Sequence, residues 1–402
     1  MNKRLINRYQ KDISEEIIQS DLHPVLKRIY SHRGVSNLRQ VDYSLEHMLP
    51  LDQLKGLDLA VTILKNAVIS NKKILVVGDF DADGATSTAV CLRALAMLGL
   101  NNVSYLVPNR FDFGYGLTPE LVEVAKEFQP DVLVTVDNGI SSIQGVAAAK
   151  QLGIQVVVTD HHLAGKELPA ADAIVNPNQP GCHFPSKNLA GVGVIFYVML
   201  ALRQALRKES YFNDKRPEPN MGQLLDLVAL GTVADVVPLD ENNRILVRQG
   251  LKRIQSARCC VGIQAILKVA GRDIDNIVAS DLGFAVGPRL NAAGRLEDMS
   301  LGIECLLTDD MARAMQIASE LDELNKSRRE IEQDMQQQAM KSLEPLLNEL
   351  GNEQLPRALC LYDESWHQGV IGILASRIKE KFNRPVIAFA SNGDGEIKGS
   401  AR

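Results

Sequence analysis

Carboxylates and imidazoles gather in this sequence at the ends of three short apolar runs. The segment GDFDADG follows the first run and places Asp79, Asp81 and Asp83 at alternating positions. The second run ends at Asp137 in VDNG, and the third ends in TDHH, which contains Asp160, His161 and His162. Three carboxylates so close together repel one another, so they need cations or protons between them. In TDHH, one imidazole could bind a metal ion while the neighbouring carboxylate orients it.

A fourth acid, Asp235, lies within the apolar stretch LLDLVALGTVADVVPL (224–239). Burying an unpaired carboxylate is costly, so a metal ion or a hydrogen-bonding partner is expected there. The candidate metal ligands are Asp79, Asp81, Asp83, Asp137, His161 and Asp235. Mixed carboxylate and imidazole ligands suit Mn²⁺ or Mg²⁺. Two such ions sharing a carboxylate stabilise the attacking and leaving oxygens of a phosphoryl displacement.

Each motif also has a simpler interpretation. D-x-D-x-D-G is typical of the start of an EF-hand loop, but that loop needs a Glu six residues after the Gly, where this chain has Val90. A solvated acidic turn explains GDFDADG alone, and an ordinary Asn-Gly turn explains VDNG alone. A satisfied polar turn explains TDHH alone. The joint pattern is more specific than any of its members.

The elements that would position these residues are short apolar strands alternating with helices. The predicted strands are 73–79, 103–108, 131–137 and 154–160, and the predicted helices are 85–98, 117–128 and 142–152. This alternation predicts an α/β fold with a parallel sheet covered on both faces. Ligands of such sheets bind beyond the carboxyl ends of the strands, where the acids lie.

The rest of the chain divides into further units. Helical patterns dominate residues 189–306, and a long polar helix is predicted from 309 to 347, with Pro345 as a candidate for ending it a turn early. A smaller α/β unit follows. The predicted domains are an N-terminal extension (1–50), a catalytic domain (51–308), a connecting helix (309–350) and a partial second domain (351–402). Because the chain stops at GSAR, we expect a truncated fragment.

Composition narrows the class of protein. The 402 residues carry 44 basic and 49 acidic side chains, a net charge of −5, which argues against a protein that coats nucleic acid but permits a local basic groove. The N-terminus lacks the apolar region of a signal peptide, and no stretch approaches the ~20 apolar residues of a membrane helix. Six cysteines without CxxC spacing favour a reducing compartment, so we expect a cytoplasmic protein with no membrane contact.

The combination of DxDxDG, VDNG, Asp-His-His and the aspartate of GTVADVVPL resembles the DHH phosphoesterase family. Four further segments are similar to its branch of single-strand-specific DNA exonucleases: VPNRFDFGYGL (107–117), LAGVGV (189–194), GPRLNAAGR (287–295) and SWHQGVIGILASR (365–377). The final GSAR is similar to the start of the family's C-terminal DHHA1 signature. The resemblance extends from about Lys73 to Arg402.

The resemblance implies a DHH domain joined by a long helix to a smaller, partial DHHA1-type domain, with a further OB-fold missing. It implies a 5′→3′ exonuclease that converts single-stranded DNA to 5′-mononucleotides in recombination and repair, using two Mn²⁺ or Mg²⁺ ions. The implied partners are single-stranded DNA with a 5′ end, a helicase and a single-strand-binding protein. A monomer is expected.

The resemblance also assigns roles to individual residues. His162 would face the scissile phosphate and Arg289 would clamp phosphate oxygens. The expected substrate-binding residues are Asn291, Arg295, His367 and, for the 5′-phosphate, Arg110, Ser400 and Arg402. Simpler interpretations remain open for three of these. Arg110 could form a surface ion pair, Arg289 could pair with an acid in the core, and the Trp366-His367 segment could pack the second domain.

Other functions are compatible with parts of the pattern. A phosphodiesterase for short oligonucleotides or cyclic dinucleotides, or a pyrophosphatase, would use similar acids, but such enzymes are usually shorter and lack the LNAAGR and WHQGVIG segments. A non-catalytic DNA-binding scaffold of the same fold would typically lack the metal-binding acids, all of which are present here. A DNA exonuclease is therefore the leading hypothesis.

Overall fold

The computed structural model describes residues 14–109, 113–350, 356–393 and 395–402, and its first domain is built on a five-stranded parallel sheet. The strand order is β2-β1-β3-β4-β5. The strands are β1 (Ile74–Val77), β2 (Val103–Leu106), β3 (Val132–Val136), β4 (Gln155–Thr159) and β5 (Ala173–Val175). Four of them match the predicted strands, whereas the short β5 was not predicted. Because β1, β3 and β4 are neighbours, their acidic ends meet at one edge.

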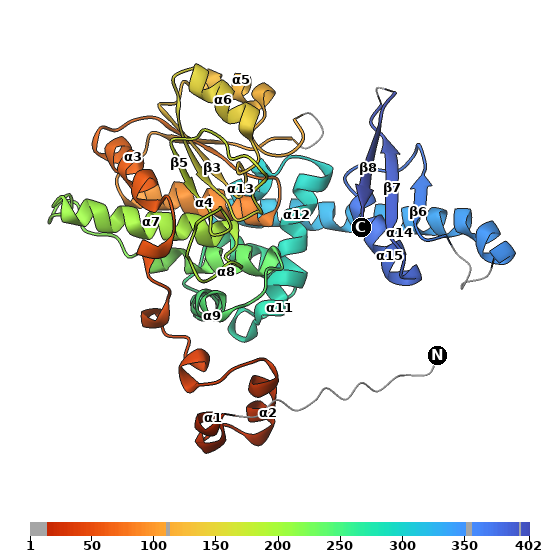
Figure 1. Cartoon of the computed structure of the whole chain (residues 1–402), viewed down its shortest axis with the longest axis horizontal. Helices are drawn as coiled ribbons and strands as arrows, with labels where there is room; N and C mark the ends of the chain where they lie inside the picture. The colour runs from red at the N-terminus through yellow and green to blue at the C-terminus, as the bar shows by residue number, and fades with distance from the viewer. Residues whose placement is uncertain (1–13, 110–112, 351–355, 394) are drawn as a thin grey trace.

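Apolar residues alternate between the two faces of the sheet, so both faces are buried. Leu75, Leu133 and Val156 face α5 and α6, whereas Ile74 and Val134 face α4 and α7. Figure 1 shows these helix pairs on opposite sides of the strands. The helices of this part are α3 (Leu57–Ile69), α4 (Ala82–Met97), α5 (Pro119–Glu127), α6 (Ile143–Gln151) and α7 (Gly191–Lys208). The observed layers confirm the predicted parallel-sheet α/β class.

A helical layer completes the first domain and brings Asp235 to the sheet. Its helix α8 is almost entirely apolar and packs between α4, α7 and α9. The remaining helices are α8 (Leu225–Ala234), α9 (Glu241–Gln255), α10 (Val261–Val269), α11 (Ala279–Asp281), α12 (Gly287–Leu296) and α13 (Ser300–Leu307), with the π-helical turn η6 (Leu282–Val286) before α12. Asp235 directly follows α8, so the packing of this helix determines where that carboxylate lies.

The N-terminal segment is made of short helices and turns. They are α1 (Glu15–Gln19), α2 (Pro24–His32) and the 3₁₀ turns η1 (Leu38–Val41), η2 (Leu45–His47) and η3 (Leu51–Gln53); two further 3₁₀ turns are η4 (Met221–Leu224) and η5 (Ile274–Asn276). In the described part of the chain, no helix is both long and apolar enough to cross a membrane.

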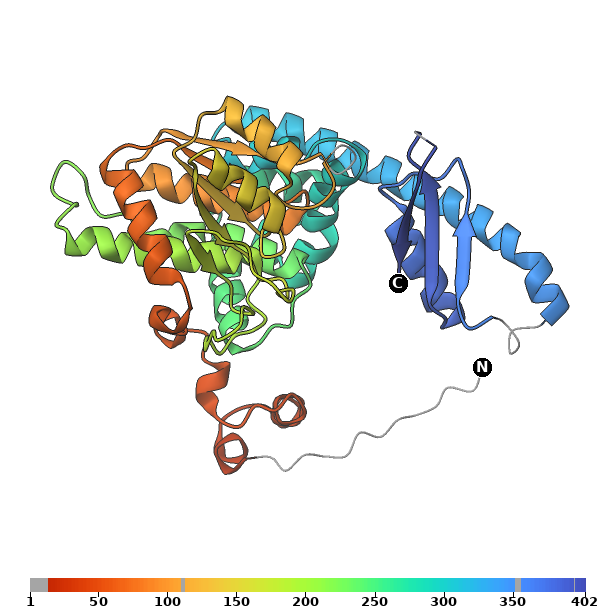
Figure 2. The same cartoon turned by 45° about the horizontal axis from the view of Figure 1, so that its top comes forward.

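A single helix, α14 (Met311–Leu350), joins the two domains (Figures 1 and 2). Its first half contributes Ile317 and Leu321 to the core of the first domain, and its second half contributes Met335 and Ala339 to a separate core. The predicted connecting helix is therefore confirmed. The predicted early end at Pro345 is wrong, since the helix continues to Leu350. Proline removes one backbone donor, and the carbonyl it would have bonded belongs to the exposed Lys341, which water can solvate.

The second domain is a small α/β unit packed on the far end of α14. Its strands are β6 (Leu359–Tyr362), β7 (Val386–Ser391) and β8 (Ile397–Ala401), in the order β6-β7-β8, with α15 (Ile371–Phe382) connecting the parallel pair β6 and β7. β8 runs antiparallel to β7. Trp366 is 4% exposed in this core and donates its indole N–H to Gln338 of α14 at 2.8 Å. Its side chain is therefore part of the core of the second domain.

We predict that Trp366→Ala destabilises the second domain, since it leaves a cavity between α14 and α15. The expected loss of unfolding free energy is about 3–5 kcal/mol. Thermal unfolding followed by circular dichroism measures it, with Trp366→Phe as the milder control that keeps most of the ring volume. Identical melting of Trp366→Ala and the parent protein would contradict a structural role for the indole.

Candidate metal centre

The first three acids lie where β1 passes into α4, and backbone N–H groups hold each of them. Asp81 is the N-cap of α4, and its Oδ1 accepts hydrogen bonds from the amides of Asp83 (2.9 Å) and Gly84 (3.0 Å). Asp79 Oδ1 accepts from the amide of Phe80 at 2.8 Å. Because Asp81 caps the helix, α4 begins at Ala82, three residues before the predicted start.

Asp83 is anchored by a second helix. Its buried carboxylate accepts hydrogen bonds from the amides of Gly191 (2.7 Å) and Val192 (2.9 Å), at the start of α7. A helix N-terminus stabilises negative charge through its unpaired N–H groups and its dipole. The segment LAGVGV thus supports an acid that lies more than a hundred residues earlier in the chain.

Asp137 occupies a conformation that few residues adopt, directly after β3. Its φ is +62°, in the left-handed region where aspartate and asparagine are tolerated better than most residues. Gly191 packs against its carboxylate: a Cβ at position 191 would lie 2.6 Å from Asp137 Oδ1. Only glycine at position 191 leaves room for the Asp137 carboxylate.

His161 brings the acids of the sheet and of α8 together. Its Nε2 lies 3.1 Å from Asp137 Oδ1, 3.5 Å from Asp235 Oδ2 and 3.9 Å from Asp83 Oδ2. Burial lowers the pKa of the His161 imidazole to about 4, so the ring is neutral at pH 7, as a metal ligand must be. Nε2 and Asp137 Oδ1 are buried and lack a hydrogen-bond partner among the described residues. Buried polar atoms without a protein partner are typical of metal ligands.

The ligand atoms form two groups, each contained within 4.8 Å. One group consists of Asp79, Asp81 and Asp137, and the other of Asp83, His161 and Asp235. The contact between His161 and Asp137 joins them. The structure thus brings together all six residues predicted as metal ligands, and it places Asp137 where a carboxylate could bridge two ions. A further group combines Asp137, His161 and His162.

The buried carboxylates of the cluster repel one another and are stabilised by positive charge. Burial, and then the neighbouring carboxylates, raise the pKa values of Asp83 and Asp137 well above the ordinary value. Burial and Asp81 raise the pKa of Asp235 to about 7. Without cations these acids would retain protons, whereas divalent cations remove the repulsion. Both the donor set and its electrostatics therefore fit divalent metal ions.

Asp160 holds the second histidine of the Asp-His-His motif. Its carboxylate accepts from the amides of Ile140, His161 and His162, and from His162 Nδ1 at 2.7 Å. Burial opposes ionisation of Asp160, but the bonds to His162 and the amides lower its pKa overall. The hydrogen bond to Asp160 is the main reason that the pKa of His162 rises to about 9. Asp160 is therefore a positioning residue, which the sequence indicated only through its place beside the histidines.

Tyr115 also contacts this pair, and sequence analysis did not select it. Its hydroxyl lies 3.3 Å from His162 Nδ1, and its ring meets the His162 ring edge-on at 5.8 Å between centroids. A pocket of about 530 Å³ opens beside these residues and extends to Ser142 at the start of α6. The only sequence signal for Tyr115 was its position within FGYGL.

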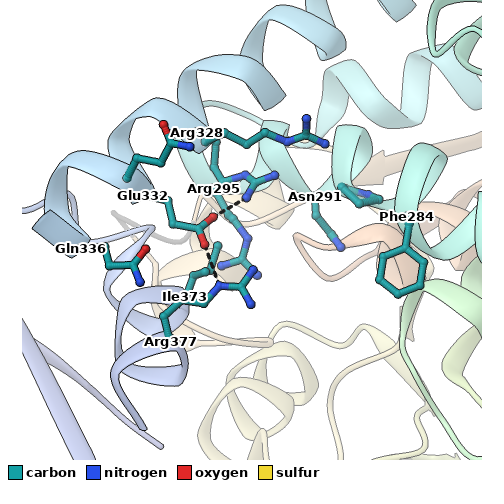
Figure 3. Close-up of a pocket in the computed structure, with 11 residues that line it drawn as sticks. Phe284, Asn291, Arg295, Arg328, Glu332, Gln336, Ile373 and Arg377 are labelled. Atoms are coloured by element: carbon teal, nitrogen blue, oxygen red, sulfur yellow. Dashed lines mark hydrogen bonds and ion pairs between the residues drawn. The ribbon is translucent and has the colours of Figure 1, made fainter. Parts of the chain in front are cut away.

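Two predicted substrate-binding residues line a larger cavity between the domains. Asn291 and Arg295 of α12 line an open cavity of about 600 Å³ together with residues of α14 and α15 (Figure 3). Asn291 Oδ1 also accepts from the amide of Ala82 at 2.8 Å, and Arg295 donates to the carbonyl of Gly369 at 3.2 Å. These bonds connect α12 to the start of α4, directly after Asp81, on one side and to the second domain on the other.

Arg289 forms the ion pair that the sequence had left open. Its Nε and Nη2 lie 2.9 and 2.7 Å from Asp322 Oδ1 of α14, and Nη1 donates to the carbonyl of Ala285 at 2.6 Å. The guanidinium therefore connects α12 to α14. To contact a phosphate it would have to share or leave this pair, so its clamping role stays a prediction.

The remaining predicted residues lie in the second domain or outside the described residues. Ser400 Oγ and Arg402 Nη2 converge on Gly372 of α15, 3.1 and 3.0 Å from where a Cβ would lie. His367 Nδ1 accepts from the amide of Gly369 at 3.1 Å. Arg110 lies outside the residues that the structure describes.

Comparison with known proteins identifies the family. The model for the "DHH family, N-terminal domain" matches residues 73–232, and the DHHA1 domain model matches residues 355–402. The chain is 57% identical over 401 residues to the single-stranded-DNA-specific exonuclease RecJ of Salmonella typhimurium, covering all of this chain and 69% of that protein. The chain belongs to the RecJ family. The RecJ protein of Escherichia coli is 56% identical over 402 residues, with the same coverage.

Solved RecJ structures have the same fold. A crystal structure of exonuclease RecJ bound to manganese superposes with a TM-score of 0.74 at 37% identity, covering 88% of this chain and 83% of that one. The Thermus thermophilus RecJ in complex with Mn²⁺ gives a TM-score of 0.76 at 35% identity, covering 93% and 52%. The resemblance drawn from the DHH motifs is thereby confirmed as membership of the RecJ family.

We predict that Gly191→Ala weakens metal binding, because the added methyl group would displace the Asp137 carboxylate. Loss of a supporting contact around a metal site typically costs about 10–100-fold in affinity. Calorimetric titration with Mn²⁺ measures it. Gly165→Ala is the matched control, since the nearest atom to its added Cβ lies 3.8 Å away. Unchanged Mn²⁺ affinity in Gly191→Ala would show that Asp137 is not held there as a ligand.

Proposed function

We propose that this chain is a metal-dependent 5′→3′ exonuclease that hydrolyses single-stranded DNA to 5′-mononucleotides in recombination and repair. The main observation in support is the buried cluster in which two ligand groups are joined by the contact between Asp137 and His161. The RecJ relatives at 56–57% identity, named as single-stranded-DNA-specific exonucleases, indicate the substrate.

Two divalent ions, Mn²⁺ or Mg²⁺, are the proposed cofactors. Their ligands would be Asp79, Asp81, Asp83, Asp137, His161 and Asp235. The imidazole ligand favours Mn²⁺, whereas the carboxylates suit either ion. When bound, such ions supply a hydroxide nucleophile and stabilise the charge on the leaving oxygen.

The protein's own residues would orient the substrate around this centre. His162 is held by Asp160, whose hydrogen bond raises the pKa of the imidazole to about 9, and we propose that its ring faces the scissile phosphate. Asn291 and Arg295 line the cavity between the domains and are proposed to contact the strand further along. Arg289 is proposed to reach a phosphate by exchanging part of its pairing with Asp322.

The second domain is proposed to select the 5′ end. Ser400 and Arg402 converge beside the N-terminus of α15, and His367 lies close by. A helix N-terminus is suited to bind a phosphate, so we propose that these residues bind the 5′-phosphate with the help of Arg110. We further propose that the protein is a monomer in the cytosol. It would act on DNA ends opened by a helicase, together with a single-strand-binding protein. Buried free thiols such as Cys91 and Cys305 are compatible with a reducing compartment.

The proposed activity predicts the products of a single digestion. A 5′-phosphorylated, 3′-labelled single-stranded oligonucleotide should shorten progressively from its 5′ end with Mn²⁺ present, and chelator should stop the reaction. Gel electrophoresis over time measures this. Shortening from the 3′ end would contradict the polarity, and hydrolysis that persists in chelator would contradict the metal centre.

We predict that Asp137→Asn abolishes hydrolysis but keeps the fold. Asparagine adopts the same left-handed backbone, so the loop is retained while the bridging charge is lost. The rate should fall by at least the roughly 100-fold that removal of one electrostatic stabilising group costs in other enzymes. In metal-free protein the variant should melt above the parent, because burial and nearby carboxylates oppose the Asp137 charge.

Initial rates on single-stranded DNA and thermal melting with and without Mn²⁺ measure both effects. The control is Asp58→Asn, an exposed acid at the start of α3. Full activity in Asp137→Asn would exclude a bridging role for this residue.

A further inference from the structure

Asparagine side chains hold the backbone carbonyls of both histidines in the Asp-His-His motif. Asn178 Nδ2 donates to the carbonyl of His161 at 2.6 Å, and Asn176 Nδ2 donates to the carbonyl of His162 at 3.0 Å. Both asparagines belong to the segment VNPNQ (175–179), which begins at the last residue of the edge strand β5. We call Asn176 and Asn178 the asparagine pair. The pair holds the backbone that carries both imidazoles.

The turn that presents the asparagine pair has supports of its own. The amide of Asn178 donates to Asn176 Oδ1 at 2.7 Å, which is the bond of an Asx-turn. Pro177 lies between them and disfavours a helical backbone at the preceding residue, so the chain leaves β5 in an extended form. Lys187 Nζ donates to the carbonyl of Pro177 at 2.6 Å and anchors the turn to the loop that follows. The turn is therefore held independently of the histidines.

The partners of both side chains fix which end of each carboxamide is the donor. Asn178 Nδ2 faces two carbonyls, those of His161 and of Lys187, the second at 3.1 Å. A carboxamide oxygen in that place would meet acceptors only. Asn176 is completely buried, and it faces an amide N–H with Oδ1 and a carbonyl with Nδ2. Neither side chain can turn over without losing its bonds, so both are donors to the histidine backbone.

The asparagine pair completes a frame whose other side is Asp160. The amides of His161 and His162 both donate to Asp160 Oδ1, at 2.7 and 3.1 Å. The N–H groups of the two histidines are thus held by a carboxylate, and their C=O groups by two carboxamides. A bond from the amide of Asp160 to the carbonyl of Val175, at 3.1 Å, extends the pairing of β4 with β5 by one residue. The place of both imidazoles therefore depends on β5, the strand that the sequence did not predict.

A functional side chain must be held within about 0.5 Å of its productive position, so the support of its backbone matters. We propose that Asn176 and Asn178 are positioning residues with separate effects. Asn178 sets the metal affinity of the centre through His161, and Asn176 sets the rate of hydrolysis through His162. This inference rests on the proposed function, in which His161 binds a metal ion and His162 faces the scissile phosphate.

The test measures Mn²⁺ affinity by calorimetric titration and kcat on single-stranded DNA for one variant of each asparagine. Asn178→Ala should weaken Mn²⁺ binding about 10- to 100-fold, the usual cost of losing a support around a metal ligand, and excess Mn²⁺ should restore most of its kcat. Asn176→Ser should bind Mn²⁺ as the parent does, with a kcat lower by up to about 100-fold at saturating Mn²⁺. Serine lacks the carboxamide donor, but its hydroxyl can still close the turn.

A third carboxamide in the same turn is the matched control. Gln179 is buried, and its Nε2 also donates to two carbonyls, those of Lys55 at 3.1 Å and Ile174 at 2.8 Å. Gln179→Ala should lower the melting temperature as the asparagine variants do, but it should alter neither Mn²⁺ affinity nor kcat. If all three variants lose Mn²⁺ affinity and kcat in step with their melting temperatures, the asparagine pair only stabilises the fold and the proposal is overturned.

The outcomes also separate this inference from the proposed function. If the parent protein binds no Mn²⁺, or binds it and hydrolyses no single-stranded DNA, the proposed function fails. If the parent binds Mn²⁺ and hydrolyses DNA while Asn178→Ala keeps the full Mn²⁺ affinity, the exonuclease stands and the positioning role fails. Should Asn178→Ala not fold, Asn178→Ser, which retains one donor, takes its place and should show a smaller loss of Mn²⁺ affinity.

Discussion

Repulsion among buried carboxylates is the constraint on which the rest of this structure depends. Asp83 and Asp137 are almost completely buried, and Asp79, Asp81 and Asp235 lie close by. Such a cluster is stable only if backbone donors and cations offset its charge. The fold supplies the donors from the start of two helices: the first turn of α4 serves Asp81, and the first turn of α7 serves Asp83. The sheet order makes β1, β3 and β4 neighbours, and this order is what brings the acids at their ends together.

The two histidines are suited to different roles because their environments differ. His161 is buried among acids that would each bind a metal ion, and its pKa is lowered to about 4. His162 is partly exposed and bonded to the ionised Asp160, and its pKa is raised to about 9. One ring is therefore suited to bind a metal ion and the other to carry a proton toward the solvent side.

Much of this arrangement could be predicted from the residues. Apolar β-branched runs indicate buried parallel strands, and parallel strands bring their carboxyl ends together, so acids far apart in the chain were expected to meet. Contacts that depend on tertiary packing could not be predicted in the same way. The pairing of Arg289 with Asp322 depends on how α12 lies against α14, and the contact of Gly191 with Asp137 depends on how α7 approaches the sheet. Periodicity reports which face of a helix is apolar but not which helix it meets.

The connecting helix imposes a rule on how the length of this chain can change. Leu321 packs in the first domain and Met335 in the second, about four turns further along α14. Inserting one residue between them would rotate the second domain by about 100° and move it by about 1.5 Å. The arginines that line the cavity from α14 and α15 would then no longer face α12. Even steps of about seven or eleven residues, which restore the helical phase, would move the second domain by roughly 10–17 Å and break the bond between Arg295 and Gly369, so the length of this segment should be fixed.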